Sequence, residues 1–148
     1  MKIQLHPDSF NPWQELQDYQ QQRLSKQQGE FGATASFVGT MRDFNEGDQV
    51  SAMTLEYYPG MTEKQLGKIA DDAQQRWELI DVLIEHRVGE IKPGQPIVLV
   101  AVWSIHRGNA FDACRFVMEE LKHHAPFWKK EVLEEQSRWV ESNTDGYK

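Results

Sequence analysis

The sequence predicts a single α+β domain in which helices pack on a mostly antiparallel sheet. A continuous apolar run at 97–103 is typical of a central strand. The turn at 92–95, built on Pro93-Gly94, joins this run directly to the strand before it, which favours an antiparallel pair. A 3.6-residue apolar period over 66–77 indicates a helix that buries one face. A chain of 148 residues is about one domain long, so we expect one domain over 1–148.

Four segments rich in β-branched, aromatic or other apolar residues predict strands, and most of them end at turn residues. A polar loop at 40–48, with its turn at 45–48, separates the first two segments. Pro59-Gly60 ends the second. The expected strands are 31–39, 50–58, 79–88 and 97–103, and the third of them alternates apolar and polar residues.

Two amphipathic helices are expected after the second and fourth strands. Thr62 and Gln65 form a capping box for the first helix. Asn109 is expected to cap the second, and Pro126 ends it because the residue before a proline is pushed out of the helical region. The Gln-rich run 14–28 predicts a polar surface helix or a mobile N-terminal element. The expected buried faces are Leu66, Ile69, Ala70, Ala73 and Trp77 in the first helix, and Phe111, Cys114, Met118 and Leu121 in the second.

The composition narrows the class of protein. The net charge is −7, which argues against a general nucleic-acid-binding domain with its basic face. No apolar run approaches the roughly 18 residues that a membrane span needs, and the first residues show no signal peptide. Cys114 is the single cysteine, so an internal disulfide cannot form and a reducing compartment is expected. We therefore expect a cytoplasmic protein.

One segment runs against the acidic character of the chain. Residues 104–130 carry five Lys and Arg against three acids. At its end, the run 122–131 gathers several cations around the apolar turn Ala125-Pro126-Phe127. Positive charge collected against the overall sign indicates an anion site. The charge pattern alone also fits an alternative to an anion site, namely cations at the C-terminal end of a helix that interact favourably with its dipole.

Lys122 and Lys129 are the candidate reactive groups of this run. Pro126 breaks the helix between them, so the chain turns after Lys122. Two ammonium groups held close together lower one another's pKa, and so does partial burial. A lysine close to neutrality acts as a general base, general acid or nucleophile. Two solvated surface lysines are the alternative.

His106-Arg107 follows the apolar strand and directly precedes a helix. Backbone N–H groups and the helix dipole favour an anion at such a junction, and the guanidinium adds a bidentate donor for phosphate or carboxylate. Arg42 lies on the polar loop and is a weaker candidate. The alternative is that His106 is a histidine with its hydrogen bonds made within the protein, and that the arginines lie on the surface without binding an anion.

Several kinds of site are not indicated. The sequence has no P-loop and no dinucleotide-binding glycine fingerprint. The histidines lack metal-ligand spacing, so no metal site is expected. Cys114 lies on the apolar stripe of its helix, and core packing is the default for it, as for Phe37 and Met118.

Four blocks of sequence together resemble the large, catalytic subunit of molybdopterin synthase. The resemblance runs from about 31 to 140 in order and with plausible spacing, which suggests a family-like core at 31–140 preceded by an N-terminal element at 1–30. Thr40-Met41 and Asp43 differ from the residues more usual in that family. The four blocks are 55–61 (LEYYPGM), 86–90 (HRVGE), 104–107 (SIHR) and 122–131 (KHHAPFWKKE).

The resemblance implies a fold and a reaction. The fold is an α/β hammerhead-like α+β domain. The enzyme is a sulfurtransferase of molybdenum cofactor biosynthesis, which converts cyclic pyranopterin monophosphate (precursor Z) into molybdopterin by installing a dithiolene. The sulfur comes from a thiocarboxylate on the C-terminal Gly-Gly tail of a small ubiquitin-like subunit. A dimer of large subunits carries two small ones in a heterotetramer, and the large subunit uses no cofactor of its own.

The resemblance also implies roles for individual residues. Lys122 matches an essential active-site lysine and Lys129 a second lysine. Phe37 and Met118 flank the channel for the incoming tail. Arg138 reaches the pocket of a neighbouring protomer. The expected substrate-binding residues are Thr40, Met41, Arg42, His106, Arg107, Lys130, Glu131 and Arg138.

Three other functions remain open on the sequence. A non-catalytic scaffold that binds a ubiquitin-like tail needs a groove but not two lysines with His106-Arg107. A phosphoesterase acts on a cyclic phosphate without a protein partner. RNA binding predicts steep salt dependence of association and ranks last, because the chain is acidic. The chemical role of Lys122 and the order of the two sulfur transfers do not follow from the sequence.

Overall fold

The computed structural model describes residues 1–45, 47–133 and 137–140. These residues have the expected α+β fold with mostly antiparallel sheets. The elements in chain order are β1 (Lys2–His6), α1 (Pro12–Arg23), a 3₁₀ turn (Ser25–Gln27), β2 (Ala33–Thr40), β3 (Phe44–Asn45), β4 (Asp48–Tyr57), α2 (Met61–Trp77), β5 (Asp81–Arg87), β6 (Gly89–Ile91), β7 (Pro96–Ser104), α3 (Arg107–His124), β8 (Phe127–Leu133) and β9 (Ser137–Trp139).

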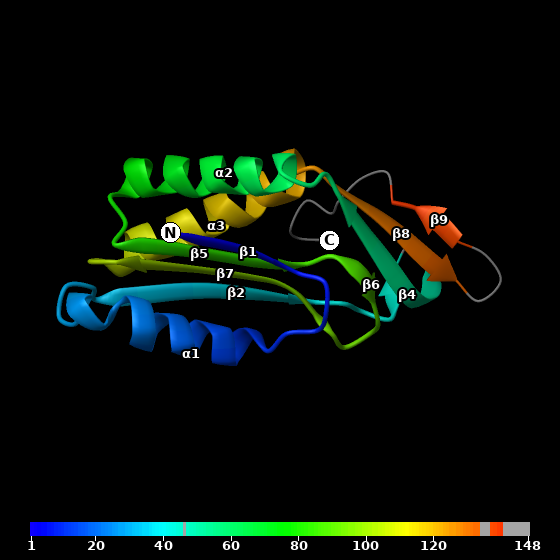
Figure 1. Cartoon of the computed structure of the whole chain (residues 1–148), viewed down its shortest axis with the longest axis horizontal. Helices are drawn as coiled ribbons and strands as arrows, with labels where there is room; N and C mark the ends of the chain where they lie inside the picture. The colour runs from blue at the N-terminus through cyan, green and yellow to red at the C-terminus, as the bar shows by residue number, and fades with distance from the viewer. Residues whose placement is uncertain (46, 134–136, 141–148) are drawn as a thin grey trace.

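The first sheet has the strand order β1-β5-β7-β2. Its pairs are antiparallel except β1 with β5, which are parallel. Helices α2 and α3 cover one face and α1 covers the other (Figure 1). The apolar run is central in this sheet, as predicted. The expected alternation at 79–88 is wrong, because β5 is buried along its whole length between the two helical layers.

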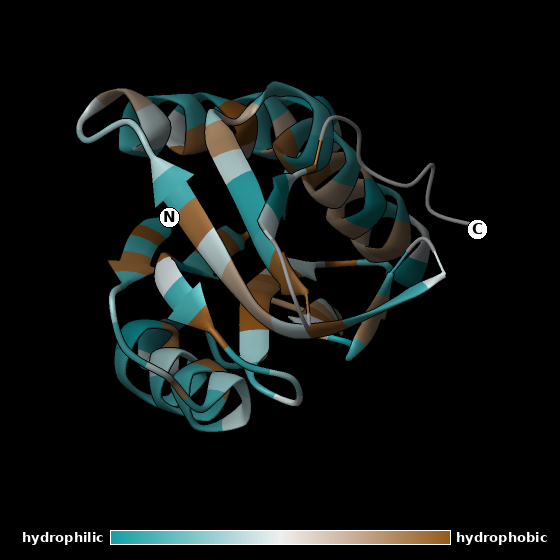
Figure 2. Ribbon diagram, turned by 90° about the vertical axis from the view of Figure 1, so that its right-hand side faces the viewer, coloured by the Kyte–Doolittle hydropathy of each residue, from teal (hydrophilic) through white to brown (hydrophobic). Residues whose placement is uncertain are grey.

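The two faces of β7 supply two apolar clusters. Val98, Val100 and Val102 pack toward α2 and α3, while Leu99 and Trp103 pack toward α1. This follows from the two-residue period of a strand. In Figure 2 hydrophilic residues dominate α1, at the bottom, whereas the helices at the top carry brown and teal bands. The Gln-rich run is therefore a surface helix that contributes few apolar side chains.

The second sheet has the order β3-β4-β8-β9, and β6 also pairs with β4. It projects from one end of the first sheet (Figure 1). Asn45 pairs with Asp48 across the expected turn, and Gly47 has a φ of 81°, which glycine adopts without strain; Glu46 lies outside the described residues. The sequence did not predict β8 or β9, and it also missed β1.

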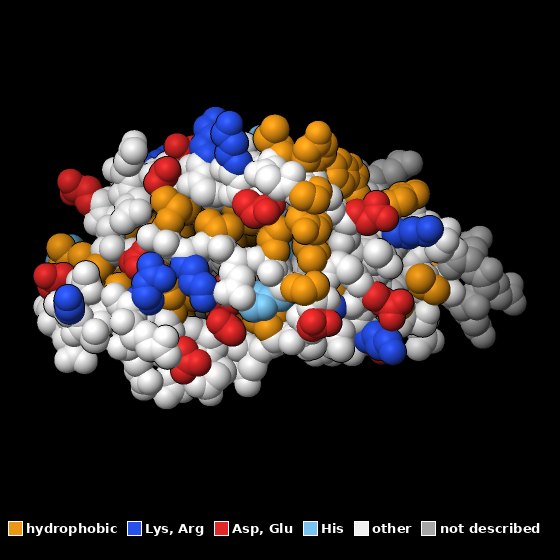
Figure 3. Space-filling view, viewed as in Figure 1, with side chains coloured by type: hydrophobic (Ala, Val, Ile, Leu, Met, Phe, Trp, Pro, Cys, Tyr) orange, Lys and Arg blue, Asp and Glu red, His pale blue; other side chains and the backbone are white. Residues whose placement is uncertain are grey.

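Both predicted helix caps are wrong, although both helices exist. Helix α2 begins after Gly60, whose N–H donates to Glu63 Oε1 at 3.1 Å. Thr62 is instead fully buried, and its hydroxyl donates to the Pro126 carbonyl at 3.0 Å and accepts from the Tyr58 N–H. Apolar side chains stay exposed at this corner, Tyr58 and Met61 among them (Figure 3).

Helix α3 begins at Arg107, two residues before the expected cap. Asn109 lies in its first turn and donates to the Trp77 carbonyl at 3.5 Å. Phe111 was expected to be buried but is 67% exposed, because it lines a groove beside α3, whereas Cys114, which also lines the groove, is buried in the core. The helix ends at His124 with Ala125 extended, as the following Pro126 predicts.

Candidate active site

Two hollows in the surface meet at Lys122. The larger, of about 820 Å³, lies between β2 and α3. The smaller, of about 490 Å³, lies where α3 ends and β8 begins. Lys122 lines both. An extended chain lying in the larger hollow therefore has a path to an amine that also faces the smaller one.

The walls of the larger hollow follow from the local sequence. On α3, Cys114, Met118 and Lys122 recur at four-residue spacing and so share one face of the helix. On the other side, Phe37 and Thr40 belong to β2, the edge strand of the first sheet. The structure thus places Phe37 and Met118 in one groove, and Phe37 is 42% exposed.

Gly39 gives this groove its shape. A Cβ at position 39 would lie 2.8 Å from Val98 Cγ1 and 3.2 Å from Phe37 Cε1. The first distance is shorter than Cβ contacts in proteins and the second is tight, so a larger residue would displace the Val98 side chain and press on the Phe37 ring. The glycine therefore allows the ring to lie across β2 at the wall of the groove.

The chain reversal at Pro126 brings Lys129 to Lys122. Strand β8 pairs with β4, with Lys129 opposite Leu55, and Lys129 and Lys122 both line the smaller hollow. Burial, which is the largest cause, and then the charge and hydrogen bond of Lys122 together lower the pKa of Lys129 to about 7. Glu131 opposes this shift, and Arg42 adds to it. The predicted lysine pair exists, and Arg42 brings a third cation to it.

His86 is a member of this site that the sequence did not reveal as functional. It lines the smaller hollow with both lysines and is 3% exposed. Its Nδ1 lies 2.8 Å from the Arg87 carbonyl oxygen, and its ring stacks on Phe127 with centroids 4.1 Å apart. Only its position in one of the four quoted blocks pointed to it, because the approach of β5 to β8 is a tertiary contact.

Glu131 and Arg138 bind each other. Arg138 donates through Nε to Glu131 Oε1 at 3.0 Å and through a terminal nitrogen to Asp48 at 2.9 Å. Asn45 donates to the other Glu131 oxygen at 2.8 Å. Glu131 is 5% exposed. Within one chain these two residues tie β3, β4, β8 and β9 together, and Glu131 influences the site through Lys129.

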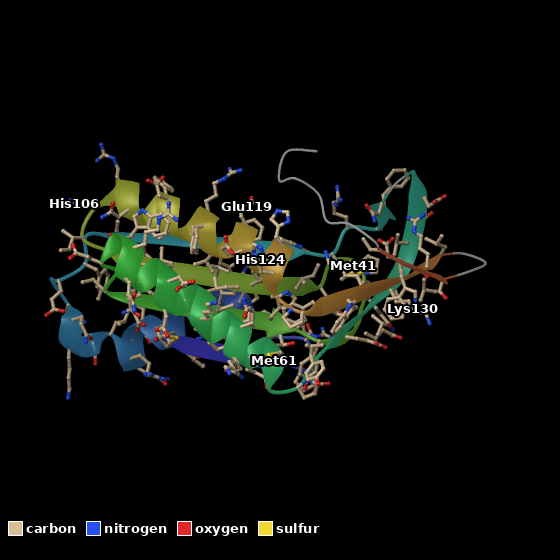
Figure 4. The ribbon with its side chains drawn as sticks, turned by 90° about the horizontal axis from the view of Figure 1, so that it is seen from above. Met41, Met61, His106, Glu119, His124 and Lys130 are labelled. Atoms are coloured by element: carbon tan, nitrogen blue, oxygen red, sulfur yellow. The ribbon has the colours of Figure 1, made fainter. Side chains whose placement is uncertain are left out.

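Other predicted residues lie away from the pair. Lys130 is on the opposite face of β8 from Lys129, with its amine 5.6 Å from the centroid of the Trp139 ring. Met41 is 6% exposed and packs in the core of the second sheet, whereas its neighbours Thr40 and Arg42 line the groove. Figure 4 shows Met41 and Lys130 at one end of the molecule.

His106 and Arg107 lie at the other end of α3 from Lys122. The helix has 18 residues, and at 1.5 Å per residue Arg107 and Lys122 are roughly 22 Å apart. Figure 4 shows His106 at the far end from Met41 and Lys130. The expectation that one chain gathers these residues in one pocket is therefore corrected: they share a helix but occupy its two ends.

One group of possible metal ligands occurs within the described residues. Ligand atoms of His6, Glu15 and Glu85 lie within 4.8 Å of one another. Lys2 already brings its amine to 3.9 Å from each of the two carboxylates. Glu85 alternates with Ile84 and His86 along β5, so the group faces away from the lysine pair. None of the helices in the described part of the chain combines the length and apolar character of a membrane span.

The geometry defines a class of protein. An open groove beside an edge strand suits an extended peptide, and the cations at its end suit an anion. Lys129 has a pKa close to neutrality, so the same place can exchange protons near pH 7. The geometry thus suits a protein that brings an extended chain and an anionic reactant to one lysine pair.

Comparison with known proteins identifies the family. The model of the family described as "MoaE protein" matches residues 13–124, and the chain belongs to this family. It is 52% identical to the molybdopterin synthase catalytic subunit of Pseudomonas aeruginosa over 141 residues, which are 95% of this chain and 91% of that one.

Solved structures agree with this. The molybdopterin biosynthesis MoaE protein of Burkholderia ambifaria matches with a TM-score of 0.78 and 46% identity over 98% of this chain and 93% of that chain. A complex of subunits 1 and 2 of molybdopterin-converting factor from Helicobacter pylori matches with a TM-score of 0.78, over 96% and 92% of the two chains. At 20% identity the second likeness is one of fold.

Proposed function

We propose that this chain is the catalytic subunit of a molybdopterin synthase. It transfers sulfur from the C-terminal thiocarboxylate of a small ubiquitin-like subunit to cyclic pyranopterin monophosphate and so forms the dithiolene of molybdopterin. The observation that carries this proposal is the position of Lys122, which lines both the groove and the smaller hollow. Membership of the MoaE family supports it.

The groove takes the tail of the small subunit. A Gly-Gly tail is narrow enough to pass between the Phe37 ring on β2 and Met118 on α3, both of which line the groove. Its terminal thiocarboxylate is an anion and would end beside Lys122, Lys129 and Arg42. Thr40 and Arg42, also in the groove lining, contact the substrate from the β2 side.

The lysines assist the transfer of each sulfur. The thiocarboxylate sulfur bonds to a carbon of the pterin side chain while a carbon–oxygen bond at that carbon breaks and its oxygen leaves with a proton or with the phosphate. Water then cleaves the acyl–sulfur bond, which leaves the sulfur on the pterin and returns the tail as a carboxylate. Lys122 transfers a proton or stabilises the acyl intermediate. Lys129, as an ammonium, stabilises negative charge that develops beside it. The chain's own residues supply this chemistry, so the proposal includes no cofactor.

In this proposal His106 and Arg107 bind the phosphate of a substrate that is held by Lys122 of another copy of the chain. One α3 separates them from its own Lys122 by roughly 22 Å, so a substrate held by Lys122 meets them only from a second copy. The expected heterotetramer, with two large and two small subunits, offers such a copy. Arg138 remains a candidate contact between protomers, and Lys130 and Glu131 remain candidate substrate neighbours.

A single-turnover assay tests the proposal. The purified chain is mixed with a thiocarboxylated small subunit and cyclic pyranopterin monophosphate, and the dithiolene is detected as its oxidised fluorescent derivative. We expect product in proportion to thiocarboxylate. A small subunit with an ordinary C-terminal carboxylate is the matched control and must give none.

The alternatives give different results in the same assay. Tail binding without product from an intact thiocarboxylate contradicts the proposal and favours the scaffold. Phosphate release from the cyclic phosphate without a small subunit favours a phosphoesterase. We also propose that the chain works in the cytoplasm, where its single buried thiol, Cys114, stays reduced.

A further inference from the structure

His86 is held between the first sheet and the start of β8. It lies on β5 and, by the alternation of a strand, shares a face with Val82 and Ile84, which pack toward α2 and α3. Its ring stacks on Phe127 with an interplanar angle of 16°. Phe127 precedes Lys129 by two residues, so the strand that carries Lys129 begins against the imidazole.

The surroundings of His86 determine its tautomer. Nδ1 lies 2.8 Å from the Arg87 carbonyl oxygen, which can only accept, so Nδ1 carries the hydrogen. Burial lowers the pKa of His86 to about 3, outweighing the Arg87 hydrogen bond that raises it, and the charges of Lys122 and Lys129 lower it as well. The ring is therefore neutral at physiological pH, and Nε2 is an acceptor.

Side-chain acceptors are scarce around the lysine pair. Among the described residues that line the smaller hollow, His86 and His123 are the side chains other than the two lysines that offer an acceptor nitrogen or oxygen. The His123 side chain is 52% exposed, with its Nε2 3.6 Å from a carboxylate of α3. Glu131 lies near Lys129, but it does not line the hollow, and its oxygens accept from Asn45 and Arg138 in the second sheet. His86 Nε2 is thus the neutral acceptor on the buried wall.

We infer that His86 is a positioning residue of the lysine pair, whose Nε2 accepts a hydrogen bond from the ammonium that Lys122 and Lys129 share. The two amines are hydrogen-bonded to each other, so one ammonium can donate to the other amine and to the imidazole at once. This leaves the second amine with a fixed direction for its proton transfers. The role in sulfur transfer rests on the proposed function.

The groups that face the pair set its titration, and His86 is the neutral one among them. Lys122 on α3, Lys129 and Glu131 on β8 and Arg42 after β2 carry the charges. A hydrogen bond from an ammonium to His86 stabilises the charged form. Its loss therefore lowers the pKa of the lysine that titrates near 7, whereas the net charge of the pocket stays the same.

The test compares His86→Leu with His86→Gln. Leucine fills the space beside Phe127 without an acceptor, whereas the glutamine carbonyl restores one. His124→Leu is the control, because His124 pairs with Glu120 outside the hollow. NMR titration of lysine Cε signals in the isolated chain measures the midpoint without partner or substrate, and single-turnover sulfur transfer from pH 6 to 9 gives the rate.

We expect His86→Leu to lower the midpoint by about one pH unit and the single-turnover rate about 10- to 100-fold. His86→Gln should recover most of both, and His124→Leu should change neither. An unmoved midpoint in folded His86→Leu overturns the inference, as do equal midpoints and rates in His86→Leu and His86→Gln. A shifted midpoint in a chain whose wild type forms no dithiolene upholds the hydrogen bond and refutes the proposed function separately.

Discussion

The first sheet and the second sheet differ in what their inward faces bury. In the first, β5 and β7 bury apolar side chains toward both helical layers. In the second, the inward face of β8 sets Lys129 and Glu131 between Phe127 and Leu133. Burying charge costs stability unless it is paired. The comparison indicates that the first sheet stabilises the fold, whereas the second sheet lowers its stability in order to hold a reactive amine.

Lys122→Ala should have the largest effect on rate and tests whether the lysine pair serves activity and not stability. Removing a general acid or base costs about 10²–10⁴ in rate, so we expect single-turnover sulfur transfer to fall by that amount. The free energy of unfolding should change by less than about 1 kcal/mol, because the lysine contributes little to packing. Lys68→Ala, an exposed lysine on α2, is the control. A folded, partner-bound Lys122→Ala chain with full activity would refute the assignment.

Leu99→Ala probes the first sheet and should have the opposite effect. Leu99 is fully buried on β7, so its truncation should lower the free energy of unfolding by about 2–5 kcal/mol. Urea denaturation measures this change. The folded fraction should still transfer sulfur at the wild-type rate, since Leu99 faces α1 and not the lysine pair.

Leu55→Ala is the matched variant in the second sheet. Leu55 is equally buried but lies opposite Lys129 and lines the smaller hollow. It should lose both stability and rate. Equal rates in Leu55→Ala and Leu99→Ala would mean that the two sheets do not divide their work as described.

The same difference explains what the sequence could predict. The apolar run of β7 and the periodic face of α2 report burial directly, so β2, β5 and β7 of the first sheet and the helices α2 and α3 on it were predicted, whereas β1 was missed. Strand β8 reads FWKKEVL, with charges at three successive positions, and such a pattern does not indicate a strand. A strand that serves a site buries the residues that a pattern assigns to the surface.

Contacts between distant segments lay beyond the sequence for another reason. The lysine pair was predictable because Pro126 forces a reversal within seven residues. The approach of His86 to Phe127 depends on how the two sheets meet, which no local pattern encodes. Conversely, His106-Arg107 was grouped with Lys122 on charge, although a continuous helix of 18 residues keeps them apart.

Complementation tests the two ends of α3. If Arg107 serves the pocket of a second copy, Arg107→Ala alone should lower the rate about 10- to 100-fold, as loss of a charged contact does. Mixed with Lys122→Ala chains and allowed to exchange subunits, it should recover about a quarter of wild-type activity, because half of the dimers then contain one intact site of two. We expect this recovery only when Arg107→Ala chains are mixed with Lys122→Ala chains. Chains that carry both substitutions are the control and should show none. No recovery despite exchange contradicts a shared site.

Lys129→Met tests, through the free energy of unfolding, whether the second sheet is destabilised by the buried amine. The pKa of Lys129 is about 7 in the folded chain and about 10.4 for an unfolded lysine. Between these values the unfolded state binds more protons than the folded state. The destabilisation caused by Lys129 is therefore complete below pH 7, and the free energy of unfolding of the wild type rises as this destabilisation disappears between pH 7 and 10. Lys129→Met should therefore be more stable near pH 7, by on the order of 1–3 kcal/mol, with the difference shrinking toward pH 10.

Urea denaturation at pH 6 to 10 measures this difference, with Lys68→Met as the exposed control. The same variant should transfer sulfur more slowly, because the ammonium that stabilises developing charge is lost. A gain in stability coupled to a loss of rate is what a site built from buried cations requires, since both effects arise from the one desolvated ammonium. A Lys129→Met chain that is less stable than the wild type at pH 7, or whose difference is independent of pH, would show that β8 holds this lysine without strain.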